Sequence, residues 1–488
     1  MKKRKSLPIK SALIYALGIF GVQLFIGYIN SFQTEFYNKM YSGFDSNIFY
    51  ASAIIIFAAK LISCFFDPLI GAMIDRSTLK GGKMRPWVLR SSFPFAVLTT
   101  VIFIYIPFEN FICGKFLLYL YITVTTVLWN IAMSFADIPS QGMLSLLFED
   151  SDERNLAASF SNIAKTVALA VPGVFVTVVM MMLSFIKGEG NYDNKEYYII
   201  TALFLFVIGI YCILLMYRKN TESIKSAKSS ETVSIKEMFA ELKQNKMIFI
   251  VFLINVLGFA RSMGLIVCAQ ANGALIGKIN FFGSQMDTTA DATWLPGLLG
   301  AVSGFIGICI VPLINKRLGE KKTYTAFSVA TFIFNSAVCI FYWRLPQESI
   351  LRYGNNALYM IMVIQFIIGF LTAANTYIPL VMTADIVDYR LYKTGIHKEG
   401  VNYAILSLSI KLSNALCVAA GLLIIAASGY TQVIYETGNI PVKMQNIIMF
   451  AYIGFVGISA LLSAIPVLFY KIDFQTKKEM HNHLKPQS

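Results

Sequence analysis

The chain has 488 residues, of which 56% are hydrophobic and 14% charged, and its formal net charge is +14 at pH 7. A soluble globular domain has about 25% charged residues, so this composition excludes an ordinary water-soluble protein. The seven cysteines show no C-x-x-C spacing and the three histidines lie outside the apolar runs, so neither a disulfide framework nor a metal site is expected.

Apolar runs long enough for a membrane helix recur along the whole chain. A helix needs about 17–25 residues to cross the hydrocarbon core of a bilayer. The runs predict twelve spans, with limits near 11–33, 48–74, 87–107, 116–147, 156–186, 197–217, 247–270, 294–315, 323–343, 355–384, 400–428 and 445–470. The expected organisation is an N-terminal six-helix bundle (1–217), a central cytoplasmic loop (218–246), a C-terminal six-helix bundle (247–470) and a cytoplasmic tail (471–488).

The distribution of basic residues predicts the orientation in the membrane. The termini, the central loop and the other segments on their side hold 28 of the 41 Lys and Arg residues, whereas the alternate loops hold eight. Cytoplasmic loops carry the excess of Lys and Arg, so both termini are expected in the cytoplasm and the protein in the cell membrane. The positive charge is then a basic face beside anionic lipid, and no nucleic-acid partner is expected.

Seven charged residues fall inside the predicted spans. Arg90, and in part Lys165, lie near span ends, where a long side chain can reach the interface. Five lie deeper: Lys60, Asp67, Asp137, Arg261 and Lys411. A charge at the centre of a span costs about 2.5–3.5 kcal/mol on insertion, so these residues are expected to face a hydrated internal cleft. Lys60 and Arg261 could also be no more than counter-ions of a nearby carboxylate.

Polar residues at helical spacing point to the same cleft. In the fourth span Asn130, Ser134, Asp137 and Gln141 recur every three or four residues, which places them on one face of a helix. Four other spans carry similar stripes: Lys60, Ser63 and Asp67; Ser407, Lys411 and Asn414; Gln23, Asn30 and Thr34; and Ser159, Asn162 and Thr166. Five helices with one polar stripe each predict a polar passage through the membrane, as in a transporter.

Four ordered blocks resemble the glycoside–pentoside–hexuronide:cation symporter family of the major facilitator superfamily. They are Asp67-Pro-x-x-Gly71 with Gly82-Lys83-x-Arg85-Pro86-Trp87; Asp137-Ile138-Pro139 with Asp152-Glu153-Arg154; Ala384-Asp385-Ile386-Val387-Asp388-Tyr389 with Lys393-Thr394-Gly395 and Glu399-Gly400; and Lys411. The resemblance implies an all-α membrane protein of twelve transmembrane helices, with a major-facilitator fold of two six-helix bundles. It also implies uptake of a sugar or glycoside coupled to Na⁺, Li⁺ or H⁺ by alternating access.

The resemblance implies roles for individual residues. Asp137 matches a sugar-binding carboxylate, Lys411 a lysine near the sugar, and Trp129 an aromatic beside the cavity. Asp67 and Ser134 match two positions of the cation site. A cytoplasmic gate network is implied at Asp75, Arg85, Arg154, Asp385 and Asp388.

The sequence also departs from the family pattern. Gln23 stands in place of an acidic sugar ligand, Ser63 in place of a second cation-binding carboxylate, and Asn162 in place of an arginine beside the sugar. Gln141 replaces an aromatic residue. The transport class carries over, whereas the particular sugar and the coupling ion do not. A carboxylate such as Asp137 can still accept hydrogen bonds from two adjacent hydroxyls while these amides complete the set.

The resulting hypothesis is a secondary active transporter that imports an oligosaccharide, pentoside or hexuronide. The candidate substrate-binding residues are Gln23, Trp129, Asp137, Gln141, Asn162 and Lys411, and the candidate cation-coupling residues are Ser63, Asp67 and Ser134. With a single carboxylate, and with Lys60 on the same stripe repelling a cation, H⁺ is favoured over Na⁺. An excess of deep basic residues leaves an anionic sugar open as the substrate.

Other functions remain as alternatives or are disfavoured. A lipid or lysolipid carrier and an uncoupled facilitator are the alternatives on the same fold. An enzyme is not expected, because the spans contain no histidine and no cysteine cluster, and a scaffold would need a larger loop or tail. The expected partners are a small-molecule sugar, a coupling cation and the lipid bilayer, with no cofactor, no metal and a monomeric state.

Overall fold

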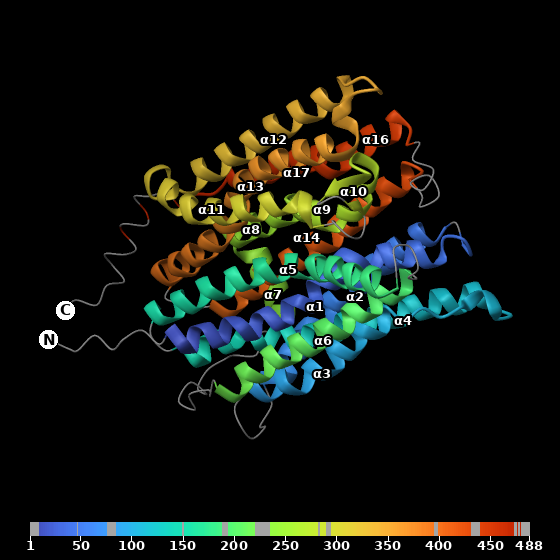
Figure 1. Ribbon diagram of the computed structural model, residues 1–488. Coiled ribbons are helices and arrows are strands. Elements are labelled where there is room, and N and C mark those ends of the chain that lie inside the picture. The colour runs from blue at the N-terminus through green and yellow to red at the C-terminus, as the bar shows by residue number, and fades with distance from the viewer. Residues whose placement is uncertain are drawn as a thin grey trace. The chain divides into compact units, whose positions relative to one another are not determined.

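The computed structural model describes residues 9–45, 47–75, 84–148, 151–187, 194–219, 235–281, 284–288, 294–394, 399–430, 440–472, 476 and 479. The chain divides into two compact units, residues 1–232 with 290–294 and residues 233–289 with 295–488. Each unit is built from helices that pack side by side (Figure 1).

The first unit contains six long helices and one 3₁₀ turn in its described residues. They are α1 (Ile9–Tyr41), α2 (Ile48–Asp75), α3 (Arg85–Ile102), η1 (Phe108–Asn110), α4 (Gly114–Leu147), α5 (Ser151–Lys187) and α6 (Asn194–Lys219). α1 packs against α5 and α6, while α4 packs against α2 and α3. This arrangement places the polar stripes of α1, α2, α4 and α5 in one bundle.

The second unit begins with shorter helices and a β-hairpin. These are α7 (Ile235–Gln244), α8 (Lys246–Leu257), η3 (Phe259–Ser262), α9 (Met263–Ile266), α10 (Cys268–Leu275), β1 (Lys278–Phe281) and β2 (Ser284–Asp287). Longer helices follow: α11 (Leu295–Leu318), α12 (Glu320–Arg344), η4 (Ile350–Arg352), α13 (Gly354–Thr394), α14 (Glu399–Ala427), α16 (Val442–Met449), the π-helical turn η5 (Phe450–Gly454) and α17 (Phe455–Val467).

The helices confirm the expected all-α membrane fold. In the part of the chain that the structure describes, nine helices are long and apolar enough to cross a membrane. The remaining predicted spans are also helical, as α2, α3 and the interrupted run from α8 to α10. The helix limits differ from the hydropathy limits in both directions. α13 continues to Thr394 although its predicted span ends at 384, whereas α3 ends at Ile102 although its predicted span ends at 107.

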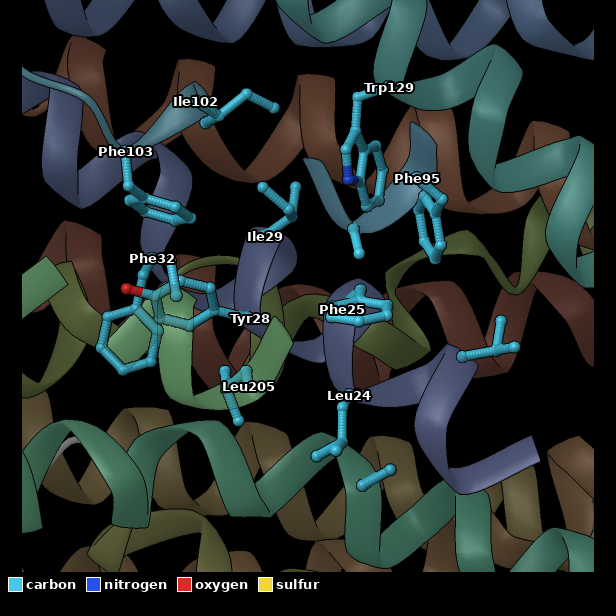
Figure 2. Packing of buried hydrophobic residues seen from close by; sticks show 14 of the residues in the cluster. Leu24, Phe25, Tyr28, Ile29, Phe32, Phe95, Ile102, Phe103, Trp129 and Leu205 are labelled. Carbon is cyan, nitrogen blue, oxygen red and sulfur yellow. The ribbon is translucent and has the colours of Figure 1, made fainter. Parts of the chain in front are cut away.

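α1 lies at the centre of the first unit's core. Figure 2 shows its side chains Leu24, Phe25, Tyr28, Ile29 and Phe32 among residues of α3, α4 and α6. A Cβ at Gly21 would lie 2.6 Å from the carbonyl oxygen of Gly209 on α6, so these two backbones meet directly. Small residues allow such close helix approach in a membrane, where packing rather than water exclusion holds helices together.

The short connection between α1 and α2 is attached to the start of α4 through Asp45. Its carboxylate accepts hydrogen bonds from the Tyr119 hydroxyl at 2.6 Å and the Asn47 N–H at 3.0 Å, and the Lys115 ammonium lies 3.6 Å away. Burial opposes ionisation of Asp45, but the hydroxyl, the N–H and the ammonium outweigh it. The pKa of Asp45 therefore lies below its ordinary value.

Acidification is expected to loosen this attachment. Because the pKa of folded Asp45 is lower than that of the unfolded chain, the stabilisation is complete above about pH 4 and is lost as the pH falls through the lower folded value. The melting temperature should therefore fall less steeply in Asp45→Asn than in the wild type when both are scanned from about pH 6 to about pH 3. Parallel curves for the two proteins would contradict this assignment.

The β-hairpin is an addition that the sequence analysis did not predict. β1 and β2 pair antiparallel, with Lys278 opposite Asp287 and Phe281 opposite Ser284. The Asn355 side chain at the start of α13 binds the other edge of β1: its Oδ1 accepts from the Asn280 N–H at 2.9 Å and its Nδ2 donates to the Asn280 carbonyl at 2.8 Å. An amide side chain thus covers an edge that would otherwise be open.

The seventh predicted span is not one continuous helix. α8 ends at Leu257, and a 3₁₀ turn follows before α9 begins. The Ser459 hydroxyl on α17 gives hydrogen-bond partners to two backbone groups at the break. It accepts from the Ala260 N–H at 3.1 Å and donates to the Leu257 carbonyl at 2.7 Å. Polar groups at a break inside hydrocarbon need such partners, since no water reaches them.

The Arg261 side chain binds further carbonyls at this break. Its guanidinium donates to the carbonyl oxygens of Gly258 at 3.1 Å and Asn255 at 3.2 Å, and to Oδ1 of Asn255 at 2.9 Å. It also donates to the Asn375 carbonyl on α13 at 2.9 Å. Pro379 lies four residues further along α13 and has no N–H, so that carbonyl lacks its helical partner. Arg261 therefore joins two interrupted helices.

Candidate substrate and ion-coupling site

The two carboxylate oxygens of Asp137 each accept a hydrogen bond from a glutamine. Gln23 Nε2 on α1 donates to Oδ1 at 3.3 Å, and Gln141 Nε2 donates to Oδ2 at 2.7 Å. Asp137 and Gln141 are four residues apart on α4, and residues at this spacing are neighbours on a helix. The sequence predicted all three residues for substrate binding, and the structure brings them together.

Lys165 on α5 extends this group. Its ammonium donates to Oε1 of Gln141 at 3.3 Å, so hydrogen bonds connect α1, α4 and α5 through four side chains. Sequence reasoning did not place Lys165 in the site, because a long side chain near a span end could have reached the interface instead. A signal was present, since Lys165 lies three residues after Asn162 of the polar stripe on α5, and residues at this spacing are neighbours on a helix.

Trp129 lies in the hydrophobic core and not beside these residues. Its ring packs on Phe95 with centroids 5.4 Å apart (Figure 2). Its Nε1 donates to the Thr99 hydroxyl of α3 at 2.9 Å. The side chain is 1% exposed. The aromatic role that the family resemblance implied for Trp129 therefore has no support in this geometry, because its hydrogen-bonding edge is already used.

Trp129→Phe is accordingly expected to weaken the fold and not the sugar site. The substitution removes a buried hydrogen bond and part of a buried ring, which costs about 1–3 kcal/mol of folding free energy. The melting temperature should fall while the affinity of the folded protein for its sugar stays unchanged. Weaker sugar binding at an unchanged melting temperature would instead support a role of Trp129 in sugar binding.

The N-terminal part of the α4 stripe is buried. Asn130 Nδ2 donates to the Thr126 carbonyl at 2.8 Å, and the Ser134 hydroxyl donates to the Asn130 carbonyl at 3.2 Å. Both residues thus use their donors on their own helix, as polar side chains in a membrane helix often do. Helical spacing predicted one polar face but could not show where along it the burial begins.

The predicted cation-coupling residues lie on α2 and α4. The buried Ser63 hydroxyl donates to the Lys60 carbonyl at 2.8 Å, and Ser134 is fully buried, while Asp67 is half-buried on α2. The Lys60 ammonium donates to Oδ1 of Asn30 on α1 at 3.2 Å. Each serine uses its proton within its own helix, so its oxygen lone pairs remain available to a proton donor or a cation.

The two other predicted substrate residues, Asn162 and Lys411, lie on α5 and α14. Asn162 is exposed on α5, one turn before Lys165, and so belongs to the same face of that helix. Lys411 is half-buried on α14 in the second unit.

Among the predicted gate residues, the structure describes the side chains of Arg85 and Asp385. Arg85 Nε donates to the Tyr217 carbonyl of α6 at 2.7 Å, and its guanidinium lies 4.2 Å from the centre of the Tyr217 ring. Asp385 is half-buried on α13. The side chains of Asp75, Arg154 and Asp388 lie outside the described residues.

An ion pair that the sequence did not suggest lies in the second unit. Glu241 is buried on α7, within the segment predicted as a polar central loop, and it pairs with Arg390 on α13. Sequence patterns could not reveal this contact because its partners are far apart along the chain. It fixes α7 to α13.

Comparison with known proteins identifies the family. A family model described as MFS/sugar transport protein matches residues 14–474. The isoprimeverose transporter of Lactiplantibacillus pentosus is 25% identical over 96% of this chain and 90% of that protein. A lactose permease of Lactobacillus delbrueckii subsp. bulgaricus is 23% identical over 85% of this chain and 62% of that protein.

The fold comparison agrees. The crystal structure of a D-xylose-proton symporter aligns with a TM-score of 0.63 at 14% identity, covering 95% of this chain and 98% of that one. A likeness at this identity shows the fold, which is the major-facilitator fold expected from the sequence. Since the family model spans nearly the whole chain and the helices are those of a membrane protein, this chain belongs to the MFS/sugar transport protein family and is a multi-pass membrane transporter, not an enzyme.

Proposed function

We propose that this protein imports a neutral sugar or glycoside across the cell membrane by cation symport, with both termini in the cytoplasm. The observation that carries the proposal is the pair of amides, Gln23 and Gln141, on the two oxygens of Asp137. The Asp137 carboxylate is a charged acceptor whose two donors are neutral amides. The hydroxyl groups of a sugar are also neutral donors, so each can take the place of one amide at the carboxylate. The names of the relatives support a sugar as the substrate.

The proposed binding residues of the first unit are Gln23, Asp137, Gln141 and Asn162. Lys411, in the second unit, stays a candidate on the sequence pattern alone. Trp129 is not among the binding residues, because it is part of the core. Alternating access would carry the bound sugar across the membrane, as in other transporters built from two helix bundles.

We propose H⁺ rather than Na⁺ as the coupling ion. The candidate site offers one carboxylate, Asp67, and two serine oxygens, whereas a sodium ion is held best by several oxygen ligands of negative charge. The positive charge of Lys60 lies two turns before Asp67 on α2 and disfavours a second cation. A proton needs only one acceptor.

Two measurements on the full-length protein test these proposals. Thermal stabilisation by isoprimeverose, lactose, xylose and methyl glucuronide, each with and without Na⁺, tests the substrate class; stabilisation by none of the neutral sugars would refute it. Uptake into vesicles tests the ion. An inward proton gradient should stimulate uptake and a sodium gradient at fixed pH should not. Stimulation by sodium alone, or by neither gradient, would refute proton coupling.

A further inference from the structure

Gln141 lies between two opposite charges. Its Oε1 accepts from the Lys165 ammonium at 3.3 Å while its Nε2 donates to the Asp137 carboxylate at 2.7 Å. The charges fix the orientation of the amide, because only its oxygen can face a cation and only its nitrogen can face an anion. One neutral group with one acceptor and one donor thus separates a lysine from an aspartate.

Lys165 is held to this group by little else. Within the part of the chain that the structure describes, its ammonium reaches Asp137 only through Gln141. An ammonium has three donors, and this contact uses one of them. Lys165 is half-buried and Gln141 is exposed, so the bridging amide can leave without disturbing a packed core.

Two neighbouring hydroxyl groups of a sugar have the hydrogen-bonding pattern of this amide. One hydroxyl can donate to Asp137 while the next accepts from Lys165, so each charge keeps a partner. We propose that Lys165 and Asp137 together bind a vicinal diol of the substrate, which takes the place of the Gln141 amide between them. This inference rests on the proposed function, and it makes Lys165 a specificity-determining residue of the sugar site.

The same charges disfavour an anionic sugar at this position. Asp137 balances Lys165, and a substrate carboxylate next to Lys165 would lie one hydrogen-bonded group from the Asp137 carboxylate. Like charges at such a separation repel each other strongly when partly shielded from water. The diol is therefore expected to belong to a neutral part of the substrate.

The test pairs a side-chain deletion with hydroxyl deletions. Lys165→Met removes the ammonium and keeps the apolar stem, and the ligands are the tightest-binding neutral sugar of the panel and its monodeoxy analogues. Loss of a hydrogen bond to a charged group should weaken binding of the parent sugar about tenfold or more. One analogue, which lacks the hydroxyl bound by Lys165, should bind the variant as tightly as the parent sugar does. The analogue lacking the hydroxyl bound by Asp137 should remain weak.

Lys187→Gln is the matched control. Lys187 lies on the same helix, where its ammonium forms an exposed ion pair with Glu196 at 2.7 Å. Removing this charge should change neither the affinity nor the ranking of the analogues. If Lys165→Met fails to fold, Lys165→Gln provides the second variant, since its shorter donor cannot span to the diol.

The outcomes separate this inference from the proposed function. A wild-type protein that binds no neutral sugar refutes both. Normal binding by the wild type, together with an unchanged ranking of analogues in Lys165→Met, refutes the role of Lys165 alone. A wild-type preference for the uronide that disappears in Lys165→Met would show that Lys165 holds an anion, which also overturns the diol assignment.

Discussion

Asp137→Asn is expected to abolish sugar binding while leaving the fold intact. The substitution removes the charge and turns one of the two acceptor oxygens into a donor, which would then face the Nε2 donor of Gln23 or Gln141. Hydrogen bonds to a charged acceptor contribute about 1.5–3 kcal/mol each, so losing two of them should weaken affinity about 100-fold or more. Thermal stabilisation by the sugar should disappear from the measurable range.

The control for this variant is Glu109→Gln. Glu109 is an exposed carboxylate of the same unit that accepts a hydrogen bond from the Tyr105 hydroxyl at 2.6 Å, outside the group around Asp137. It should bind sugar as the wild type does. The melting temperature of Asp137→Asn without sugar should stay close to that of the wild type, because the aspartate is only half-buried. Normal sugar binding by Asp137→Asn would place the substrate site elsewhere.

Arg261→Met is expected to give the largest loss of stability. It leaves the Asn255 carbonyl, Oδ1 of Asn255 and the Asn375 carbonyl without the donor that they share, whereas the Gly258 carbonyl keeps the backbone N–H of residue 261 at 3.4 Å. An unsatisfied buried polar group costs about 1–3 kcal/mol, so the folding free energy should fall by about 3 kcal/mol or more. Arg261→Lys should recover only part of this, because an ammonium lacks the planar fork that reaches several acceptors at once. The melting temperature in detergent measures the effect.

A second substitution can show that the freed carbonyls are the cause. Pro379→Ala restores an N–H to α13, which gives the Asn375 carbonyl a helical partner without Arg261. The double variant Arg261→Met/Pro379→Ala should therefore lose less stability than the sum of the single changes. Arg344→Met removes an exposed arginine of the same unit and should have little effect. Strict additivity in the double variant would argue against the carbonyl explanation.

The sequence predicts the membrane spans well because they depend on composition alone. Any apolar run of sufficient length must become helical in hydrocarbon, where each backbone group needs an internal partner. The break at Gly258 could not be predicted in this way. A glycine is tolerated within many membrane helices, and the partners that stabilise the break, Asn375 and Ser459, lie on other helices far along the chain.

The candidate site, too, could be predicted only in part: spacing along one helix can be read from the sequence, whereas contacts between helices cannot. The pairing of Asp137 with Gln141 follows from their spacing on one helix, and the polar stripe of α1 pointed to Gln23. The direction of the Lys165 side chain does not follow from spacing, because it depends on what α4 presents to α5. The position of Trp129 likewise depends on Thr99 and Phe95 of α3, which occupy its polar edge and its ring.

Arg261, at the break in the seventh predicted span, has a further consequence for a membrane protein that lies between two aqueous compartments. A guanidinium remains protonated throughout the pH range in which cells live, so its bonds to the three carbonyls persist in acidic and in neutral surroundings alike. The link that Arg261 makes between α8 and α13 is therefore expected to hold whichever side of the membrane is the more acidic.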